Sequence, residues 1–242
     1  MGATGQGGGK GNNSINSFND GPTTIKLDSP LVYSDNIQYM GNGKNQIITF
    51  ENKQIGAKRE HNLLIMNDGS VVESNTGGKK KVSASISARL KADIYTHNHP
   101  REEGVLGGSF SAEDMSNFIQ FNQRMYRAAA KEGTYVISKG NNYDATKGAE
   151  FVKQITDFQN QSYKSTRKYT KQLQQEYDAA ANKISADNSL TFAQKQAANN
   201  KAYKEVSDKL ARYANNELLA LHNWYITNAN KYGLVYSLER RK

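Results

Sequence analysis

The segment from residue 148 to residue 228 restricts the possible folds most, because its apolar residues repeat at helical spacing along nearly its whole length. An Asp-Asn-Ser break at 187–189 divides it, and Thr191 provides an N-cap for a second helix. Long helices with one apolar stripe need a partner that buries it, so an antiparallel helical hairpin is predicted. The β-type run 234–238 follows. We expect residues 229–242 to return to the core as its last strand, which makes the hairpin an insertion.

The preceding part of the chain has the pattern of a mixed α/β or α+β core. Residues 1–22, rich in Gly, Asn and Ser, are expected to be a flexible tail or linker, and 23–147 the core domain. An Asp-Gly turn near residue 68 indicates a β-hairpin. Segment 84–90 fits a strand or a short helix, and 111–131 is predicted to be a helix. The predicted core strands are 24–27, 46–50, 60–66, 70–73, 92–97 and 134–138.

Composition narrows the functional classes. The chain has no cysteine, so disulfides and thiolate metal sites are excluded. We find no run of apolar residues that could cross a membrane and no signal peptide, and expect a cytoplasmic protein, or a secreted or virion-associated part of a larger one. Residues 147–242 hold 16 Lys and Arg against 9 Asp and Glu. This basic excess suits a nucleic acid or an acidic partner, or is simply a solvated helix face.

A His-Asn-His-Pro sequence directly follows the predicted strand 92–97. His97 and His99 lie two residues apart, so in an extended strand their side chains share one face, and Pro100 ends that strand. Ser111 then begins a helix that carries Asp114 in its first turn. Two imidazoles and a carboxylate could hold a catalytic zinc ion, which needs three protein ligands and an open position for water. Alone, either half has an ordinary explanation: surface histidines, or a helix capping box.

A hydrolytic zinc site also needs a general base, and Glu60 is the best-placed candidate. Its carboxylate begins an otherwise apolar strand; a salt bridge would be the ordinary explanation, and Glu73 is the second choice. The Ser111 hydroxyl could donate to the oxyanion of a tetrahedral intermediate. His61 should point to the opposite face of its strand, and His222 is expected to pack within the hairpin or lie exposed.

The order Glu, His-x-His-Pro and Ser-x-x-Asp resembles the JAMM signature of the MPN (JAB) metallopeptidases. The His-Asn-His-Pro form is closest to the RadC-type branch, and residues 108–114 are similar to JAB modules of phage minor head proteins and polymorphic toxins. The resemblance implies a JAB/MPN-like, cytidine-deaminase-like core without the hairpin. It also implies that His97, His99 and Asp114 bind zinc. Glu60 would then activate the zinc-bound water, and Ser111 would donate to the oxyanion.

These patterns lead to one main functional expectation and two alternatives. The main one is a zinc metallopeptidase or isopeptidase that acts on a protein or peptide. The first alternative is a binding module without secure activity, which docks DNA or a phage or secretion partner through the basic hairpin. The second is a toxin domain of a larger secreted effector, which the Gly-rich start would suit. The sequence leaves the substrate and the oligomeric state open.

Overall fold

A computed structural model describes residues 41–101 and 104–239 of the chain. These residues belong to one compact unit, so the helical hairpin does not separate from the core as a second unit. The predicted tail at 1–22 and the predicted strand at 24–27 lie outside the described residues.

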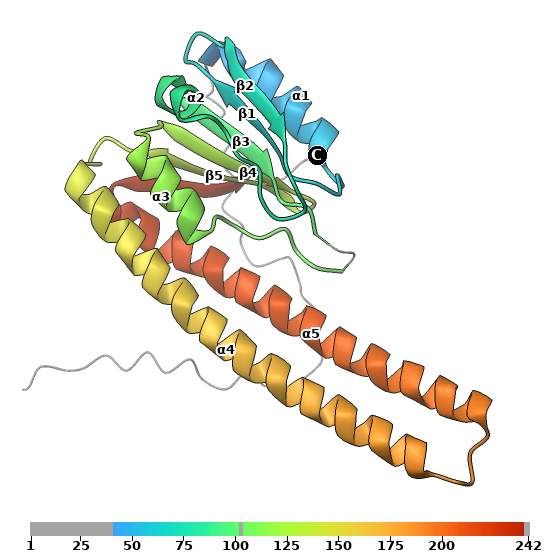
Figure 1. The fold of residues 1–242 in the computed structure, drawn as a ribbon. Helices are drawn as coiled ribbons and strands as arrows, with labels where there is room; N and C mark the ends of the chain where they lie inside the picture. Colours follow the sequence, from blue (N-terminus) through green and yellow to red (C-terminus); the bar gives the residue numbers. More distant parts are fainter. Residues whose placement is uncertain (1–40, 102–103, 240–242) are drawn as a thin grey trace, which may run out of the picture. The chain divides into compact units, whose positions relative to one another are not determined.

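The centre of the fold is a mixed sheet of six strands (Figure 1). Its order is β2-β1-β3-β4-β5-β6, in which β3 and β4 are parallel and the other neighbours antiparallel. The predicted α+β class with a mixed sheet is therefore confirmed. The strands are β1 (His61–Ile65), β2 (Val71–Thr76), β3 (Ile94–Asn98), β4 (Met125–Ala130), β5 (Gly133–Lys139) and β6 (Leu234–Glu239).

Five α-helices accompany the sheet in the described ranges. They are α1 (Lys44–Gln54), α2 (Ile86–Lys91), α3 (Ala112–Gln120), α4 (Ala145–Ala186) and α5 (Phe192–Asn228), and a short 3-10 turn, η2 (Ala229–Tyr232), follows α5. Segment 84–90, for which strand and helix both remained open, contains the start of α2. The Ser85 side chain accepts a hydrogen bond from the Ala88 N–H and so caps this helix.

One face of the sheet packs against α1. Ile47 of α1 is fully buried in a cluster with Ile94 and Met125, which lie on neighbouring strands of that face. Beside this cluster, the Arg127 guanidinium donates to the Glu51 carboxylate of α1 and to Glu239 of β6. Because both members of the Arg127–Glu51 pair are almost fully buried, the pair fixes α1 to the sheet by charge as well as by apolar contact.

The opposite face of the sheet carries the residues that alternate with these. Tyr95, His97 and Tyr126 lie there, with the Tyr95 and Tyr126 rings stacked at 4.5 Å. Phe118 of α3 packs on Tyr126 with ring centroids 6.0 Å apart, so α3 covers this face. The period-2 alternation of β3 therefore places the predicted metal-binding histidine on the face opposite α1.

Residues 46–50 form part of α1, so the prediction of a strand there is wrong. The run Ile-Ile-Thr-Phe has high strand propensity, but propensity is weaker than tertiary packing. In α1 only one narrow face is buried, with Ile47 and Glu51 one helical turn apart. Their i, i+4 spacing lets one side contact the apolar cluster and the buried arginine together.

The predicted helix at 111–131 is also wrong in its second half. α3 ends at Gln120, Asn122 takes a left-handed conformation (φ 52°), and Met125–Ala130 is strand β4. Every residue of β4 is buried, because the strand lies inside the sheet with both faces covered. Such a strand lacks the polar alternation that identifies half-exposed strands, and its apolar residues matched helical spacing by chance. Gly133 begins β5.

The predicted helical hairpin and the final strand are confirmed. α4 and α5 run side by side and contact each other along their length (Figure 1). α4 begins at Ala145, capped by Asp144, three residues before the predicted start, and Thr191 caps α5 as expected. β6 pairs antiparallel with β5, so the hairpin is inserted between two neighbouring strands. None of the helices in the described ranges is apolar enough over a sufficient length to span a membrane.

Candidate metal centre

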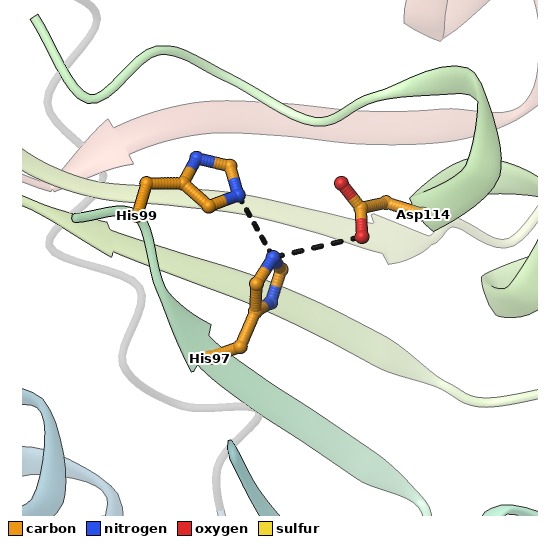
Figure 2. Close-up of side chains that lie close together, drawn as sticks. All are labelled: His97, His99 and Asp114. Carbon is orange, nitrogen blue, oxygen red and sulfur yellow. Dashed lines mark hydrogen bonds and ion pairs between the residues drawn. The ribbon is translucent and has the colours of Figure 1, made fainter. Parts of the chain in front are cut away.

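Three side chains that were predicted as metal ligands converge at one point (Figure 2). His97 lies near the end of β3, His99 follows directly after it, and Asp114 occupies the first turn of α3. One ligand atom from each residue lies within 4.8 Å of the others. The strand end and the helix start therefore bring together residues 15 and 17 positions apart in a single cluster.

The spacing of the ligand atoms suits a small cation. Nε2 of His97 lies 2.8 Å from Nε2 of His99 and 3.6 Å from Oδ1 of Asp114. In a tetrahedral zinc site with bonds of about 2.0 to 2.1 Å, ligand atoms are separated by about 3.3 Å. The two distances lie on either side of that value, and the remaining pair of atoms, from His99 and Asp114, lies within 4.8 Å, so movement of the side chains would let the three atoms surround an ion.

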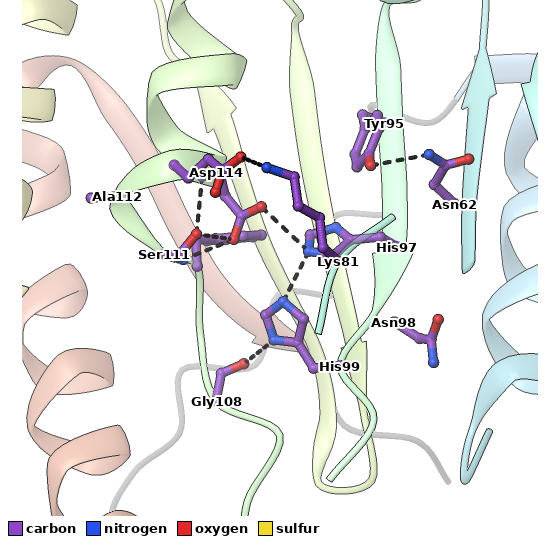
Figure 3. Close-up of polar contacts among 12 residues, drawn as sticks. Asn62, Lys81, Tyr95, His97, Asn98, His99, Gly108, Ser111, Ala112 and Asp114 are labelled. Carbon is purple, nitrogen blue, oxygen red and sulfur yellow. Dashed lines mark hydrogen bonds and ion pairs between the residues drawn. The ribbon is translucent and has the colours of Figure 1, made fainter. Parts of the chain in front are cut away.

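Hydrogen bonds orient His99 and Asp114 from outside the cluster (Figure 3). Nδ1 of His99 lies 3.0 Å from the Gly108 carbonyl oxygen, which can only accept, so Nδ1 carries the proton and Nε2 presents a lone pair to the cluster. Metal-bound histidines commonly donate their second N–H in this way. The donor set and its support thus fit a divalent ion such as zinc.

The two oxygens of Asp114 have separate roles. Oδ2 accepts from the Ser111 N–H at 2.8 Å and from the Ser111 hydroxyl at 2.7 Å, while Ser111 Oγ accepts from the Asp114 N–H. These contacts form the capping box of α3. Oδ1 remains directed to His97. The Asp114 carboxylate therefore caps the helix with one oxygen and faces the candidate metal site with the other.

The protonation states also suit metal binding. Burial lowers the pKa of His97 to about 4, although the Asp114 carboxylate opposes the shift, so the ring is neutral at pH 7. Burial would raise the pKa of Asp114, but His97, His99 and the Ser111 hydrogen bonds hold it below its usual value. A neutral imidazole and an ionised carboxylate are the forms in which His97 and Asp114 bind zinc.

Glu60, predicted as the general base, lines the same cavity as the three ligands. Its backbone pairs with Gly77 and Gly78 just before β1 begins. Burial, followed by the charge of Asp114, raises the pKa of Glu60 to about 7, while Arg101 and a backbone hydrogen bond from Val82 oppose the shift. A carboxyl group with a pKa near neutrality can both accept and return a proton.

Glu73, His61 and His222 were also considered in the sequence, but none of them lines this cavity. The Glu73 carboxylate accepts from the N–H and hydroxyl of Ser85, and Glu73 does not line the cavity. Nδ1 of His61 lies 2.9 Å from the Thr76 hydroxyl, away from the cluster. His222 of α5 is buried against the sheet, where its Nδ1 lies 2.7 Å from the Tyr236 hydroxyl of β6. The described structure therefore brings Ser111 and Glu60 to the cavity, and neither Glu73 nor His61.

The cavity that contains the cluster has a volume of about 370 Å³. The inserted hairpin supplies part of its wall: Gln159 comes from α4, and Leu218 and Leu221 come from α5. Gln159 also accepts a hydrogen bond from the Ala112 N–H at the start of α3. The hairpin, which the sequence resemblance placed outside the common core, is thus an integral part of the site.

The loop between Pro100 and Ser111 is fastened to the rest of the unit by side chains far away in sequence. Asn215 of α5 accepts from the Leu106 N–H and donates to the Gly104 carbonyl, each at 2.8 Å. The Glu132 carboxylate accepts from the N–H groups of Gly107 and Gly108. Gly108 has φ of +82°, and its backbone carbonyl is the acceptor for His99. The described part of this loop therefore has a defined position beside the ligands.

Several cavity residues were not singled out in the sequence. Arg89 of α2 and the stacked pair Tyr95 and Tyr126 line the cavity beside the cluster. Tyr95 and Tyr126 alternate with core residues on their strands, which is a detectable signal once the strands are known. Arg89 gave no such signal, because its segment fitted a strand as well as a helix.

Comparison with known proteins adds no assignment: the chain matches no protein-family model, no curated protein and no solved structure.

Proposed function

We propose that the protein is a zinc-dependent hydrolase of the JAMM type, with a JAB/MPN-like core, that cleaves a peptide or isopeptide bond. One observation carries the proposal: three potential zinc ligands converge in a cavity that also holds a carboxyl group with a pKa near 7. Glu60, His97, His99, Ser111 and Asp114 were expected to act together from their sequence pattern. All five line this one cavity.

The residues have complementary roles in this proposal. His97, His99 and Asp114 would hold the ion, which supplies Lewis acidity and lowers the pKa of water at the site to about 7. Glu60 accepts a proton from the attacking water and returns it to the leaving amine. Its partial burial and elevated pKa suit both steps, because its two protonation states are then close in free energy at neutral pH.

Ser111 has two tasks in the proposal. In the described structure its hydroxyl proton is donated to Asp114 Oδ2, which fixes the orientation of that ligand. Rotation of the O–H group about the Cβ–Oγ bond would redirect the proton to an oxyanion that develops in the cavity. The Ser111 N–H keeps its own hydrogen bond to Asp114, so the carboxylate remains oriented.

The proposal is tested by separating metal binding from hydrolysis. Purified protein should bind about one zinc per chain, measured by inductively coupled plasma mass spectrometry. It should cleave members of a fluorogenic library that contains both peptide bonds and Lys ε-linked isopeptide bonds. Glu60→Gln should retain the zinc and lower the turnover rate by at least about 100-fold, because the base is lost while the ligands remain.

Glu73→Gln is the matched control, since Glu73 was the second candidate base and lies outside the cavity lining. This variant should retain both the zinc and the turnover rate. A correctly folded protein that binds no zinc would refute the proposal. Loss of hydrolysis in Glu73→Gln with full activity in Glu60→Gln would refute the assignment of the base.

A further inference from the structure

Arg89 is a buried cation in the wall of the cavity. Its side chain projects from α2 and the residue is only 9% exposed. The guanidinium carbon lies 5.1 Å from the centre of the Tyr95 ring and 5.4 Å from the centre of the Phe121 ring. The guanidinium also donates a hydrogen bond to the Tyr126 hydroxyl. Aromatic rings and one phenol therefore form its surroundings.

These contacts leave the Arg89 guanidinium without a carboxylate in ion-pair contact. None of the ion pairs among the described residues includes Arg89, and its Nη1 is buried without a hydrogen-bond partner there. Glu73 lies within electrostatic reach of Arg89, but its oxygens accept hydrogen bonds from Ser85 and Asn75 instead of forming an ion pair with Arg89. A buried cation without a partner costs several kcal/mol, whereas each cation–π contact contributes about 0.5 to 2 kcal/mol.

Although its Nη1 is buried, Arg89 is one of the residues that line the cavity. Arg89 lines it together with His97, and the Tyr95 ring lies between them, 5.4 Å from the His97 ring. A planar guanidinium presents paired N–H groups that match the two oxygens of a carboxylate. The cavity lining holds five Lys and Arg residues against three Asp and Glu residues, so its excess of positive charge favours the entry of an anion.

We propose that Arg89 binds a carboxylate of the substrate, so that the site prefers acidic peptides. This proposal rests on the proposed function for the identity of the ligand as a peptide and for the neighbouring metal. The carboxylate is either the α-carboxylate of a free C-terminus or the side chain of Asp or Glu near the scissile bond. Both sources present the same carboxylate group to the Arg89 guanidinium, which the Tyr95 ring separates from the metal ligands.

The test measures binding without relying on turnover. Metal-free and zinc-loaded protein are titrated with three capped tripeptides, and binding is followed by NMR at the Arg89 Nε–H resonance. The probes are acetyl-Ala-Ala-Ala with a free C-terminus, acetyl-Ala-Glu-Ala-amide, and the neutral acetyl-Ala-Ala-Ala-amide. At least one anionic probe should bind about 10-fold or more tightly than the neutral one, in both forms of the protein, because a charge-assisted hydrogen bond contributes about 1.5 to 3 kcal/mol. Whichever anionic probe binds better identifies the source of the carboxylate.

Arg89→Gln should abolish this preference in both forms. Lys91→Gln is the control, since it removes an exposed positive charge from the same helix and should keep the preference. If Arg89→Gln fails to fold, as judged by circular dichroism, Arg89→Lys keeps the charge but loses the paired donors, and it should retain only part of the preference.

The outcomes separate this inference from the proposed function. Equal affinity for neutral and anionic probes, or a preference that survives in folded Arg89→Gln, overturns the role of Arg89. A preference present only with zinc places the carboxylate on the metal; it also overturns that role, and it supports the metal centre. An Arg89-dependent preference in a protein that binds no zinc supports the anion site and refutes the proposed hydrolase.

Discussion

Asp114→Asn separates the two functions that one side chain carries. The asparagine carbonyl oxygen can replace Oδ2 as acceptor for the Ser111 N–H and hydroxyl, which preserves the cap of α3. The amide nitrogen then replaces Oδ1, the atom directed to His97, and an NH₂ group has no lone pair for a metal. The variant should therefore fold normally and lose the zinc site.

The size of each effect follows from these contacts. In metal-free protein the variant loses a negative charge in the first turn of α3, which contributes about 0.3 to 1 kcal/mol, or at most about 2 to 4 °C in Tm for a domain of this size. Zinc at about 100 times its Kd should stabilise the original protein by about 2.7 kcal/mol, or about 5 to 10 °C. Asp114→Asn should lose most of this zinc-dependent shift.

Differential scanning fluorimetry with and without zinc measures both quantities in one experiment. Ser111→Ala is the converse variant: it removes the hydroxyl of the cap and should cost about 0.5 to 2 kcal/mol without metal. It should keep a zinc-dependent shift once zinc is raised well above the new Kd, because losing this support lowers the affinity by about 10- to 100-fold while the three ligands remain. A full zinc-dependent shift in Asp114→Asn, or a fall of its metal-free Tm well beyond that of Ser111→Ala, would refute the division of roles between the two oxygens.

Two further predictions concern the support of the site. Burial would raise the pKa of Glu51, but the charge and hydrogen bonds of Arg127 hold this pKa below 4.5. The Glu51–Arg127 pair therefore stabilises the fold above pH 4.5, and its contribution is lost as the pH falls through the folded-state pKa of Glu51. In urea titrations, Glu51→Gln should lower the free energy of unfolding at pH 7 by about 3 kcal/mol and make that free energy less dependent on pH in the acid range. The control, Glu176→Gln, breaks an exposed pair with Lys209 and should change the free energy of unfolding by less than about 1 kcal/mol. Equal effects of the two variants would contradict the reasoning. Asn215→Ala removes two hydrogen bonds to the loop that carries Gly108, so amide hydrogen exchange at Leu106 should become about 10- to 30-fold faster. The control, Asn223→Ala, changes an exposed residue of α5 and should leave this exchange rate unchanged. An unchanged rate in Asn215→Ala would show that other contacts hold the loop.

The sequence predicted the part of the fold whose signals are local. Helix caps such as Thr191, the Asp-Gly turn before β2 and the apolar stripes of α4 and α5 depend on neighbouring residues, and all appear in the structure. The metal cluster was predictable because β3 and the cap of α3 each restrict side-chain direction within a few positions. Local signals thus specify elements and short motifs well.

The features that were missed depend on distant parts of the chain. Residues 46–50 form a helix because Glu51 meets a buried arginine 76 positions away and Ile47 meets an apolar cluster built from four different strands. β4 resembled a continuation of α3, since no alternation survives in a strand covered on both faces. The environment of Arg89 likewise depends on the pairing of β3 with β4 and on the placement of α2, neither of which a single sequence determines.

The anchoring of the site loop has a consequence for the order in which the protein is completed on the ribosome. The Ser109 hydroxyl accepts from Tyr236, and the Phe110 carbonyl accepts from Tyr225, across 127 and 115 positions. At a synthesis rate of about 5 to 20 residues per second, residue 236 is added roughly 6 to 25 s after residue 109. The histidines and their carboxylate can therefore meet while the chain is still growing, but the cavity around them acquires its walls only after the hairpin and β6 have emerged. Translation itself thus delays maturation of the site.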